Sequence, residues 1–259
     1  MSTVSVITPS HNSAQFISET IRSVLNQSFS DWELIVVDDC STDNSVEVIQ
    51  SFVDQDSRIK LIQLSENSGA AVARNTAIEA AAGRFIAFLD SDDKWLPHKL
   101  ETQIQFMEDN DVAFSYAAYE KINEKGEVFG LMGVPEKVSY KQLLKTCVIG
   151  CLTAVYDTEK LGKVYMPTST KREDFATWLN ILKQIDFAHG LTVPLAQYRV
   201  YANQTSGKKV SMAKENWRLY RDLEKLNFFQ ASYYFGHYAV RGVLRTKFPK
   251  LAKLLGVLD

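Results

Sequence analysis

The first ninety residues of the chain alternate short apolar runs with segments of helical periodicity. The apolar runs are rich in β-branched residues and occupy residues 4–8, 34–37, 59–64 and 85–89. Between them, apolar side chains recur every three or four residues, which is typical of helices that bury one face. Repeated strand–helix–strand units predict a mostly parallel sheet with helices on both faces. A further helix is expected to open at Pro97.

The second half of the chain has a different pattern. Residues 112–121 and 128–131 are predicted to form an antiparallel hairpin. Two further strands are predicted at residues 152–156 and 195–201, and a helix at residues 175–182. From residue 211 onward the pattern is helical. We therefore predict a mixed α/β fold with one domain over residues 1–210 and a helical, basic and aromatic extension over residues 211–259.

The composition excludes several classes of protein. Hydrophobic residues make up 46% of the 259 residues and charged residues 23%, which is typical of a globular protein with a substantial core. The formal charge of −2 argues against a globally basic nucleic-acid binder, so we expect no nucleic-acid partner. Three cysteines cannot form a disulfide framework, and the sequence has neither a signal peptide nor an apolar run of about 18 residues. We expect a cytoplasmic protein, with peripheral attachment to the inner face of the cell membrane left open.

The C-terminal segment is basic although the whole chain is slightly acidic. Residues 225–258 contain six basic and no acidic side chains, and a group of aromatic residues precedes the basic run. Aromatic and cationic side chains together suit the water–lipid interface, where anionic lipids attract each basic residue by about 1 kcal/mol. Two interpretations stay open: the segment binds an anionic membrane surface, or its aromatic residues pack against the preceding domain.

Acidic side chains end two of the predicted strands. Asp38 and Asp39 follow the second strand, and Asp90, Asp92 and Asp93 follow the fourth. The carboxyl ends of parallel strands share one edge of a sheet, and ligands of open α/β sheets bind along that edge. Clustered carboxylates repel one another unless a cation lies between them, and a hard divalent ion also binds phosphate oxygens. We therefore favour a metal–phosphate site at this edge, although such aspartates also serve as turn formers and helix caps.

A glycine-rich phosphate loop is absent from the sequence. The first glycine is Gly69, so neither a Walker loop nor a dinucleotide fingerprint follows the first strand. This argues against P-loop enzymes, dinucleotide-dependent oxidoreductases and sugar nucleotidyltransferases. A phosphate ligand would then depend on the metal and on cationic side chains. Arg74 is the best placed cation, although an arginine at this helical position could equally be exposed to solvent.

Four segments in a fixed order resemble family 2 glycosyltransferases of the GT-A fold. They read VSVITPSHN at residues 4–12, LIVVDD at 34–39, NSGAAVARN at 67–75 and FLDSDD at 88–93. Their order and spacing agree over roughly residues 3–205, and the ordered set is far more specific than any one segment. The resemblance implies transfer of a sugar from a nucleotide diphosphate donor, with inversion at the anomeric carbon and with Mn²⁺ or Mg²⁺ as cofactor.

The resemblance also implies roles for residues around the nucleotide. The loop after the first strand lines the nucleoside pocket through four residues: Thr8, Pro9, Ser10 and His11. Asp39 accepts a hydrogen bond from the base, typically uracil, and Asn67 and Arg74 belong to the nucleotide-sugar site. The family usually has tyrosine at the position of His11, whose imidazole can still stack on a base.

The metal ligands and the general base are implied in the same way. Asp90, Ser91 and Asp92 form the D-x-D motif, with Asp92 as the main metal ligand and Asp90 nearer the ribose. The acid pair Glu173 and Asp174 opens a helix beside the nucleotide-sugar site, and Asp174 matches the family's general base. An acid pair at this position would also be favoured by the positive end of the helix dipole, and the two interpretations are compatible.

The resemblance also indicates how many sugars are transferred and to which class of acceptor. Many members have histidine at the position of Tyr201, so a metal or diphosphate contact from this late loop is not expected. The Gln-x-x-Arg-Trp signature of processive members is absent, which indicates transfer of a single sugar. Members of this size often build bacterial surface polysaccharides such as O-antigen, capsule or teichuronic-type polymers. We expect a UDP-sugar donor and a glycan acceptor, linked to a lipid diphosphate.

Two other functions stay open at this point. A nucleotidyltransferase would release pyrophosphate from a nucleoside triphosphate, and the missing glycine loop argues against it. A non-catalytic module that binds nucleotide sugars would neither hydrolyse nor transfer its ligand, and the combination of a D-x-D motif with a base argues against that function.

Overall fold

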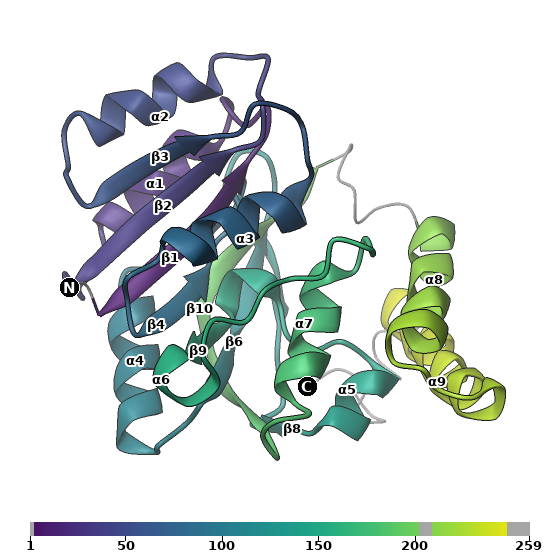
Figure 1. The fold of residues 1–259 in the computed structure, drawn as a ribbon. Helices are drawn as coiled ribbons and strands as arrows, with labels where there is room; N and C mark the ends of the chain where they lie inside the picture. The colour runs from purple at the N-terminus through teal and green to yellow at the C-terminus, as the bar shows by residue number, and fades with distance from the viewer. Residues whose placement is uncertain (1–2, 202–208, 248–259) are drawn as a thin grey trace.

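Within residues 3–201 and 209–247, which the computed structural model describes, ten strands form one sheet with helices on both faces (Figure 1). The strand order is β3-β2-β1-β4-β9-β6-β10-β5, with β7 paired to β6 and β8 paired to β10. The first four strands are parallel, as the strand–helix alternation predicts: β1 (Val4–Ser10), β2 (Trp32–Asp38), β3 (Ile59–Gln63) and β4 (Phe85–Phe88).

The two faces of the sheet bury separate cores. Successive side chains of a strand face opposite sides, so Val6 and Ile7 of β1 enter different clusters. Val6 shares its cluster with three helices on one face: α1 (Ile17–Leu25), α2 (Ser45–Val53) and α4 (Lys99–Asp109). Ile7 shares its cluster with helices on the other face, which include α3 (Ala70–Ala80) and α7 (Glu173–Ile181). The helix α7 therefore packs on the face that also carries α3.

The C-terminal half of the sheet is mixed. Its strands are β5 (Lys94–Trp95), β6 (Phe114–Ile122), β7 (Val128–Met132), β8 (Lys137–Val138), β9 (Val155–Asp157) and β10 (Ala188–Arg199). The expected hairpin is confirmed, because β6 and β7 pair antiparallel across the turn at residues 123–126. β10 runs parallel to β6, which carries its C-terminal end back to the edge where β1 and β4 end.

Two strands differ in extent from the expectation. The strand expected over 152–156 is shorter, because Cys151–Thr153 form a 3-10 turn before β9. The late strand begins at Ala188, seven residues before its expected start at 195. Its first part was missed because the register shifts on both sides of Pro194, where a bulge interrupts the alternation of buried and exposed side chains.

The first two helices start without side-chain caps. Helices α1 and α2 begin after Phe16 and Asn44, which make no side-chain capping bonds. Asn12 ties two loops together at the sheet edge, where its side-chain oxygen accepts the N–H of Thr42 at 2.8 Å. This contact holds the loop after β1 against the loop after β2.

Two helices joined by a π-helical turn end the described part of the chain: α8 (Lys209–Arg218), Leu219–Leu223 and α9 (Phe228–Lys247). They lie beside α7 and the short helix α5 (Tyr140–Lys145), away from α1 and α2 (Figure 1). The Trp217 and Phe235 rings pack 5.5 Å apart between α8 and α9. Among the described residues, none of the helices combines the length and the apolar character that crossing a bilayer requires. The division of the chain at residue 210 stays a prediction.

Candidate active site

A pocket of about 1110 Å³ opens where β1, β2 and β4 end and where α7, α8 and α9 face the sheet edge. Ten of the twelve residues predicted for the donor and catalytic site line it: Pro9, Ser10, His11, Asp39, Arg74, Asp90, Ser91, Asp92, Glu173 and Asp174. The sheet and α7 therefore bring the predicted metal ligand, Asp92, and the predicted base, Asp174, into one pocket although 82 positions separate them. Thr8 and Asn67 do not line it.

Thr8 and Asn67 have different positions outside the pocket lining. The Thr8 side chain is fully buried in the sheet, and its hydroxyl has no hydrogen-bond partner within the described residues. Asn67 contacts the exposed imidazole of His11, whose Nε2 lies 3.1 Å from the Asn67 amide nitrogen. His11 Nδ1 lies 2.8 Å from the carbonyl oxygen of Asp39, and since a carbonyl only accepts, Nδ1 donates and Nε2 accepts. Asn67 thus orients an imidazole that itself lines the pocket.

The two aspartates after β2 have different surroundings. Asp38 is buried and closes a turn, because its carboxylate accepts the N–H and the hydroxyl of Ser41 at 2.9 and 2.5 Å. The Asp39 carboxylate accepts the N–H groups of Ser68 and Gly69 at 2.7 and 2.8 Å, immediately before α3. These backbone donors hold Asp39 rigidly at the pocket wall, and its oxygens keep lone pairs for a further donor.

The loop after β4, which carries the D-x-D motif, is fixed by α1 and β10. The Thr20 hydroxyl of α1 donates to the carbonyl oxygens of Ser91 and Asp93 at 3.0 and 2.8 Å. The fully buried Arg199 at the end of β10 donates its Nε to the Asp92 carbonyl and its N–H to the Asp93 carboxylate, at 2.9 and 2.8 Å. Burial, together with the neighbouring carboxylates, raises the pKa of Asp93 well above its usual range. Asp93 is thus a structural residue of the loop.

The Asp92 carboxylate is held by a residue for which we expected no role. The Tyr201 hydroxyl lies 2.9 Å from Asp92 Oδ2 and donates to it. Burial and the neighbouring Asp92 raise the pKa of Tyr201, so the phenol keeps its proton. The tyrosine therefore contacts the predicted metal ligand at the chain position where many family members have histidine.

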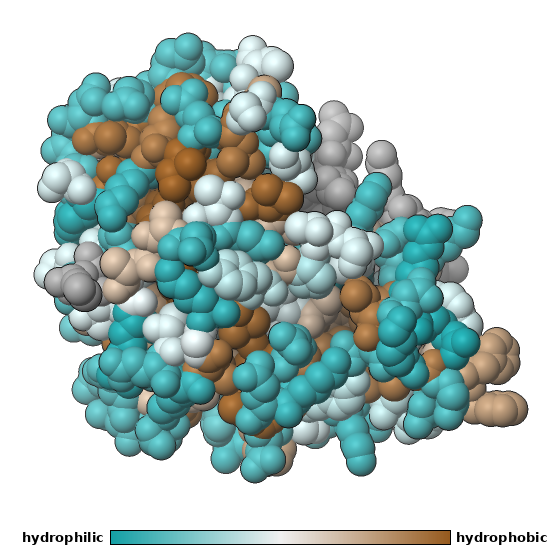
Figure 2. Space-filling view, in the orientation of Figure 1, coloured by the Kyte–Doolittle hydropathy of each residue, from teal (hydrophilic) through white to brown (hydrophobic). Residues whose placement is uncertain are grey.

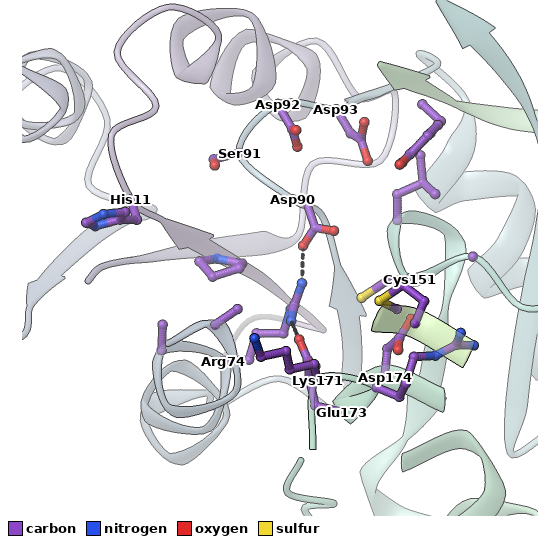
Figure 3. A pocket seen from close by; sticks show the side chains of 18 of the residues that line it. His11, Arg74, Asp90, Ser91, Asp92, Asp93, Cys151, Lys171, Glu173 and Asp174 are labelled. Carbon is purple, nitrogen blue, oxygen red and sulfur yellow. Dashed lines mark hydrogen bonds and ion pairs between the residues drawn. The ribbon is translucent and has the colours of Figure 1, made fainter. Parts of the chain in front are cut away.

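Arg74 links the D-x-D loop to the start of α7. Its guanidinium forms ion pairs with Asp90 at 2.5 Å and with Glu173 at 3.1 Å, in a row that Figure 3 shows between the two segments. The residue is only 6% exposed, so the solvent-exposed alternative is wrong. Burial by itself would lower the pKa of Arg74, but the facing carboxylates raise this pKa by a larger amount, so the net shift is upward. Burial also raises the pKa of Glu173, and Arg74 only partly offsets this.

The acid pair opens α7 as predicted, with the helix beginning at Glu173. Asp174 is half-buried at the pocket wall, and its Oδ1 accepts the N–H of Phe175 at 2.7 Å. A carboxylate in the first turn of a helix is stabilised by the helix dipole, so structural and catalytic roles are compatible here.

Some residues of the pocket were not predicted from the sequence. Lys171 and Arg172, two cations directly before the acid pair, line it, and Cys151 contributes a buried thiol. Two adjacent cations before a predicted helix are visible in the sequence, and they could have indicated Lys171 and Arg172 as pocket residues. The far wall comes from three side chains of α8 and α9: Met212, Phe235 and Tyr238. The sequence left open whether aromatic residues of this segment pack against the domain, and it could not place them at the pocket, because the wall depends on how the two helices pack beside α7.

The carboxylates of the pocket fit a divalent cation that is held partly by its substrate. Within residues 3–201 and 209–247, no group of three or more histidine, cysteine, aspartate or glutamate side chains could hold a metal ion. Asp92 offers carboxylate oxygens at the pocket wall, and Asp90 is paired with Arg74. Mg²⁺ is typically bound by one or two carboxylates together with substrate phosphates. The donor set therefore fits Mn²⁺ or Mg²⁺ that binds together with a diphosphate.

Comparisons with known proteins identify the family. The sequence profile described as glycosyl transferase family 2 matches residues 5–158. The chain belongs to glycosyl transferase family 2. This glycosyltransferase is 46% identical over 241 residues to TuaG of Bacillus subtilis, named as a teichuronic acid biosynthesis glycosyltransferase, covering 93% of this chain and 96% of TuaG. It is 42% identical over 246 residues to WfgD of Escherichia coli, a UDP-Glc:alpha-D-GlcNAc-diphosphoundecaprenol beta-1,3-glucosyltransferase, covering 95% of each protein.

Solved structures agree on the fold of this family 2 glycosyltransferase. TarS 1-349 of S. aureus in complex with UDP-GlcNAc matches with a TM-score of 0.71 at 21% identity, over 99% of this chain and 79% of that chain. A mannosyltransferase from Pyrobaculum calidifontis in complex with GDP-Man and Mn²⁺ matches with a TM-score of 0.66 at 17% identity, over 98% and 79%. At this low sequence identity, the two matches show a similarity of fold alone, and they confirm the GT-A fold expected from the sequence.

Proposed function

We propose that this family 2 glycosyltransferase moves one hexose or N-acetylhexosamine from a UDP-sugar to a lipid-diphosphate-linked glycan, with inversion, in the synthesis of a bacterial surface polysaccharide. The observation that carries the proposal is the single pocket lined by both Asp92 and Asp174. The names of two relatives support the substrate class, since WfgD is named for UDP-glucose and a diphosphoundecaprenol acceptor, and TuaG for teichuronic acid.

In the proposed reaction, the acceptor hydroxyl attacks the anomeric carbon from the face opposite the diphosphate. The bond from this carbon to the diphosphate breaks as the glycosidic bond forms, so a single displacement inverts the configuration. Asp174 accepts the hydroxyl proton. A divalent ion at Asp92 would stabilise the negative charge that develops on the departing diphosphate. His11 and Asp39 would orient the base, and Arg74 would keep Asp90 beside the ribose.

A transfer assay tests this function. The purified full-length chain is incubated with Mn²⁺, a panel of UDP-hexoses and UDP-N-acetylhexosamines, and a GlcNAc-diphosphate that carries a short lipid chain. We expect one class of donor to release UDP and to give a product extended by one sugar in the inverted configuration. Excess EDTA is expected to remove the activity, and Mn²⁺ or Mg²⁺ is expected to restore it.

Three outcomes would contradict this function or part of it. Pyrophosphate release from UTP and a sugar phosphate would indicate a nucleotidyltransferase. Donor binding without hydrolysis or transfer would indicate a non-catalytic binding module. Full activity in excess EDTA would contradict the metal but not the sugar transfer.

We also propose that the outer side of α9 contacts an anionic membrane. The aromatic residues of α9 divide between packing inside the protein and exposure to solvent. Phe235 packs on Trp217, whereas other apolar residues of α9 point to solvent. The exposed fractions are 60% for Phe228, 84% for Phe229, 54% for Tyr233 and 59% for Val240. Figure 2 shows apolar side chains projecting at the outer edge of this part of the molecule. The basic residues Lys250 and Lys253 lie outside the described residues.

Replacing Phe229 and Tyr233 together with serine should weaken binding to anionic vesicles at least tenfold. Each ring removed from the interface loses apolar burial of about 1.5–3 kcal/mol at most, and about 1.4 kcal/mol is already a tenfold change. Co-sedimentation with anionic and with neutral vesicles measures the effect. Phe129→Ser, which replaces a 59% exposed ring on β7, is the matched control. Unchanged sedimentation of the double variant would contradict the membrane role.

Point variants are preferable to truncation, which would also remove Phe235 from the pocket wall.

A further inference from the structure

The pocket contains a cationic element that the donor site does not use. Lys171 and Arg172 both line the pocket directly before the acid pair of α7. Lys171 is exposed, and within the described part of the chain its side chain forms no ion pair or hydrogen bond. Arg74, in contrast, already faces two carboxylates. Figure 3 shows Lys171 next to Glu173, so an exposed ammonium, unpaired within the described residues, lies beside the acid pair.

Arg172 keeps its charge although it is largely enclosed. Its guanidinium lies over the Phe175 ring, 5.1 Å from the ring centre. Burial lowers the pKa of Arg172, but the neighbouring Asp174 and the Tyr238 hydroxyl raise it, and the net shift is upward. A fixed positive charge thus stands between the predicted base and α9.

The far wall of the pocket continues from these cations as a less polar surface. Met212 of α8 and Phe235 and Tyr238 of α9 line the same pocket, and the outer side of α9 exposes further aromatic residues. The pocket therefore contains three chemically different surfaces, the carboxylate of Asp174, two cations, and an apolar and aromatic wall, and Arg172 lies between the first and the last. A lipid-linked acceptor carries three groups that match these surfaces, which are a sugar hydroxyl, a diphosphate and a hydrocarbon chain.

We propose that Lys171 and Arg172 bind the diphosphate of the acceptor, and that the wall formed by α8 and α9 contacts the first part of its lipid. This inference rests on the proposed function. The donor diphosphate has its own partners, the metal and Asp92, on the other side of the pocket. Ammonium and guanidinium groups form strong charge-assisted hydrogen bonds with phosphate oxygens, and the planar guanidinium can bind two oxygens at once. The cations therefore select acceptors that carry a diphosphate next to the sugar.

Two acceptors with the same sugar and the same alkyl chain test the proposal, one joined through a diphosphate and one through a neutral glycosidic bond. For Lys171→Ala, we expect the KM for the diphosphate acceptor to rise at least tenfold. Transfer to the neutral acceptor and the KM for the donor should change less than twofold. Arg172→Lys, which keeps the charge but loses the planar fork, should show a smaller loss in the same direction. Lys141→Ala, at an exposed lysine of α5, is the matched control and should change neither acceptor.

A binding experiment decides the proposal without turnover. An alkyl diphosphate is titrated into the UDP-saturated full-length protein, and Lys171→Ala should raise its Kd at least tenfold, with an unchanged melting temperature. Equal losses with both acceptors, a raised KM for the donor alone, or an unchanged Kd would overturn the assignment of this site. A wild-type protein that hydrolyses the donor but transfers to neither acceptor would contradict the proposed function, and the titration would still test the two cations.

Discussion

Replacing Asp174 with asparagine should abolish sugar transfer while donor binding stays nearly unchanged. Asparagine has the size of aspartate, and its side-chain oxygen can still accept the Phe175 N–H that Asp174 binds at 2.7 Å. The start of α7 should therefore keep its structure. The amide cannot take the proton of the acceptor hydroxyl, and loss of one positioned acid–base group typically lowers the rate by about 10²–10⁴.

Two measurements separate chemistry from binding in this variant. The rate of transfer should fall by the amount given above, and the shift in melting temperature produced by saturating UDP-sugar with Mn²⁺ should match that of the wild type. Asp109→Asn, at the exposed end of α4, is the matched control for the loss of one carboxylate and should leave both quantities unchanged. Normal turnover of the Asp174 variant would refute its role as the base.

Replacing Arg74 with methionine should destabilise the protein and weaken donor binding together. The change removes the arginine that pairs with both Asp90 and Glu173, and it leaves two partly buried carboxylates without this partner. Breaking a buried ion pair by removing one partner costs about 3–5 kcal/mol. For a chain of this size that corresponds to a drop in melting temperature of about 6–20 °C. Donor affinity should fall at least tenfold, because the D-x-D loop loses its connection to α7.

A second substitution distinguishes this explanation from a general packing defect. Glu173→Gln in the Arg74→Met background removes one of the two unpaired charges, so the double variant should be more stable than the single variant without regaining activity. Arg218→Met breaks an exposed pair with Glu215 on α8, where the arginine is 66% exposed, and should cost no more than about 1 kcal/mol. Equal stability of Arg74→Met and wild type would show that the two ion pairs contribute nothing.

Both predictions depend on how α7 is joined to the sheet edge. Asp92 belongs to the loop after β4, whereas Asp174 belongs to α7, and Arg74 of α3 lies between their two segments. Helix α3 packs on the same face of the sheet as α7, so its arginine can reach both. The buried Arg74 therefore fixes the position of the D-x-D loop relative to the start of α7. The proposed reaction requires this arrangement, because it uses Asp92 of the loop together with Asp174 of the helix.

Local patterns were sufficient to predict the parallel half of the fold. The buried strand β2 contains the apolar run of residues 34–37, and β-branched residues followed by aspartates mark its end at the sheet edge. The D-x-D motif and the acid pair were likewise visible, because each consists of neighbouring residues. The extent of β10 was not, since a bulge at Pro194 disturbs the pattern on which strand prediction depends.

The amino-acid sequence alone determined the class of fold, the family resemblance and ten residues that line the pocket, since short-range patterns carry these properties. Only the tertiary structure showed that Arg74 is buried between two acids, that Tyr201 holds Asp92, and that α8 and α9 form a wall. The reason is physical: burial, ion pairing and the shape of a pocket arise from contacts between segments far apart in the chain. Contacts between residues that are distant in the sequence form only on folding, so no local sequence pattern predicts them.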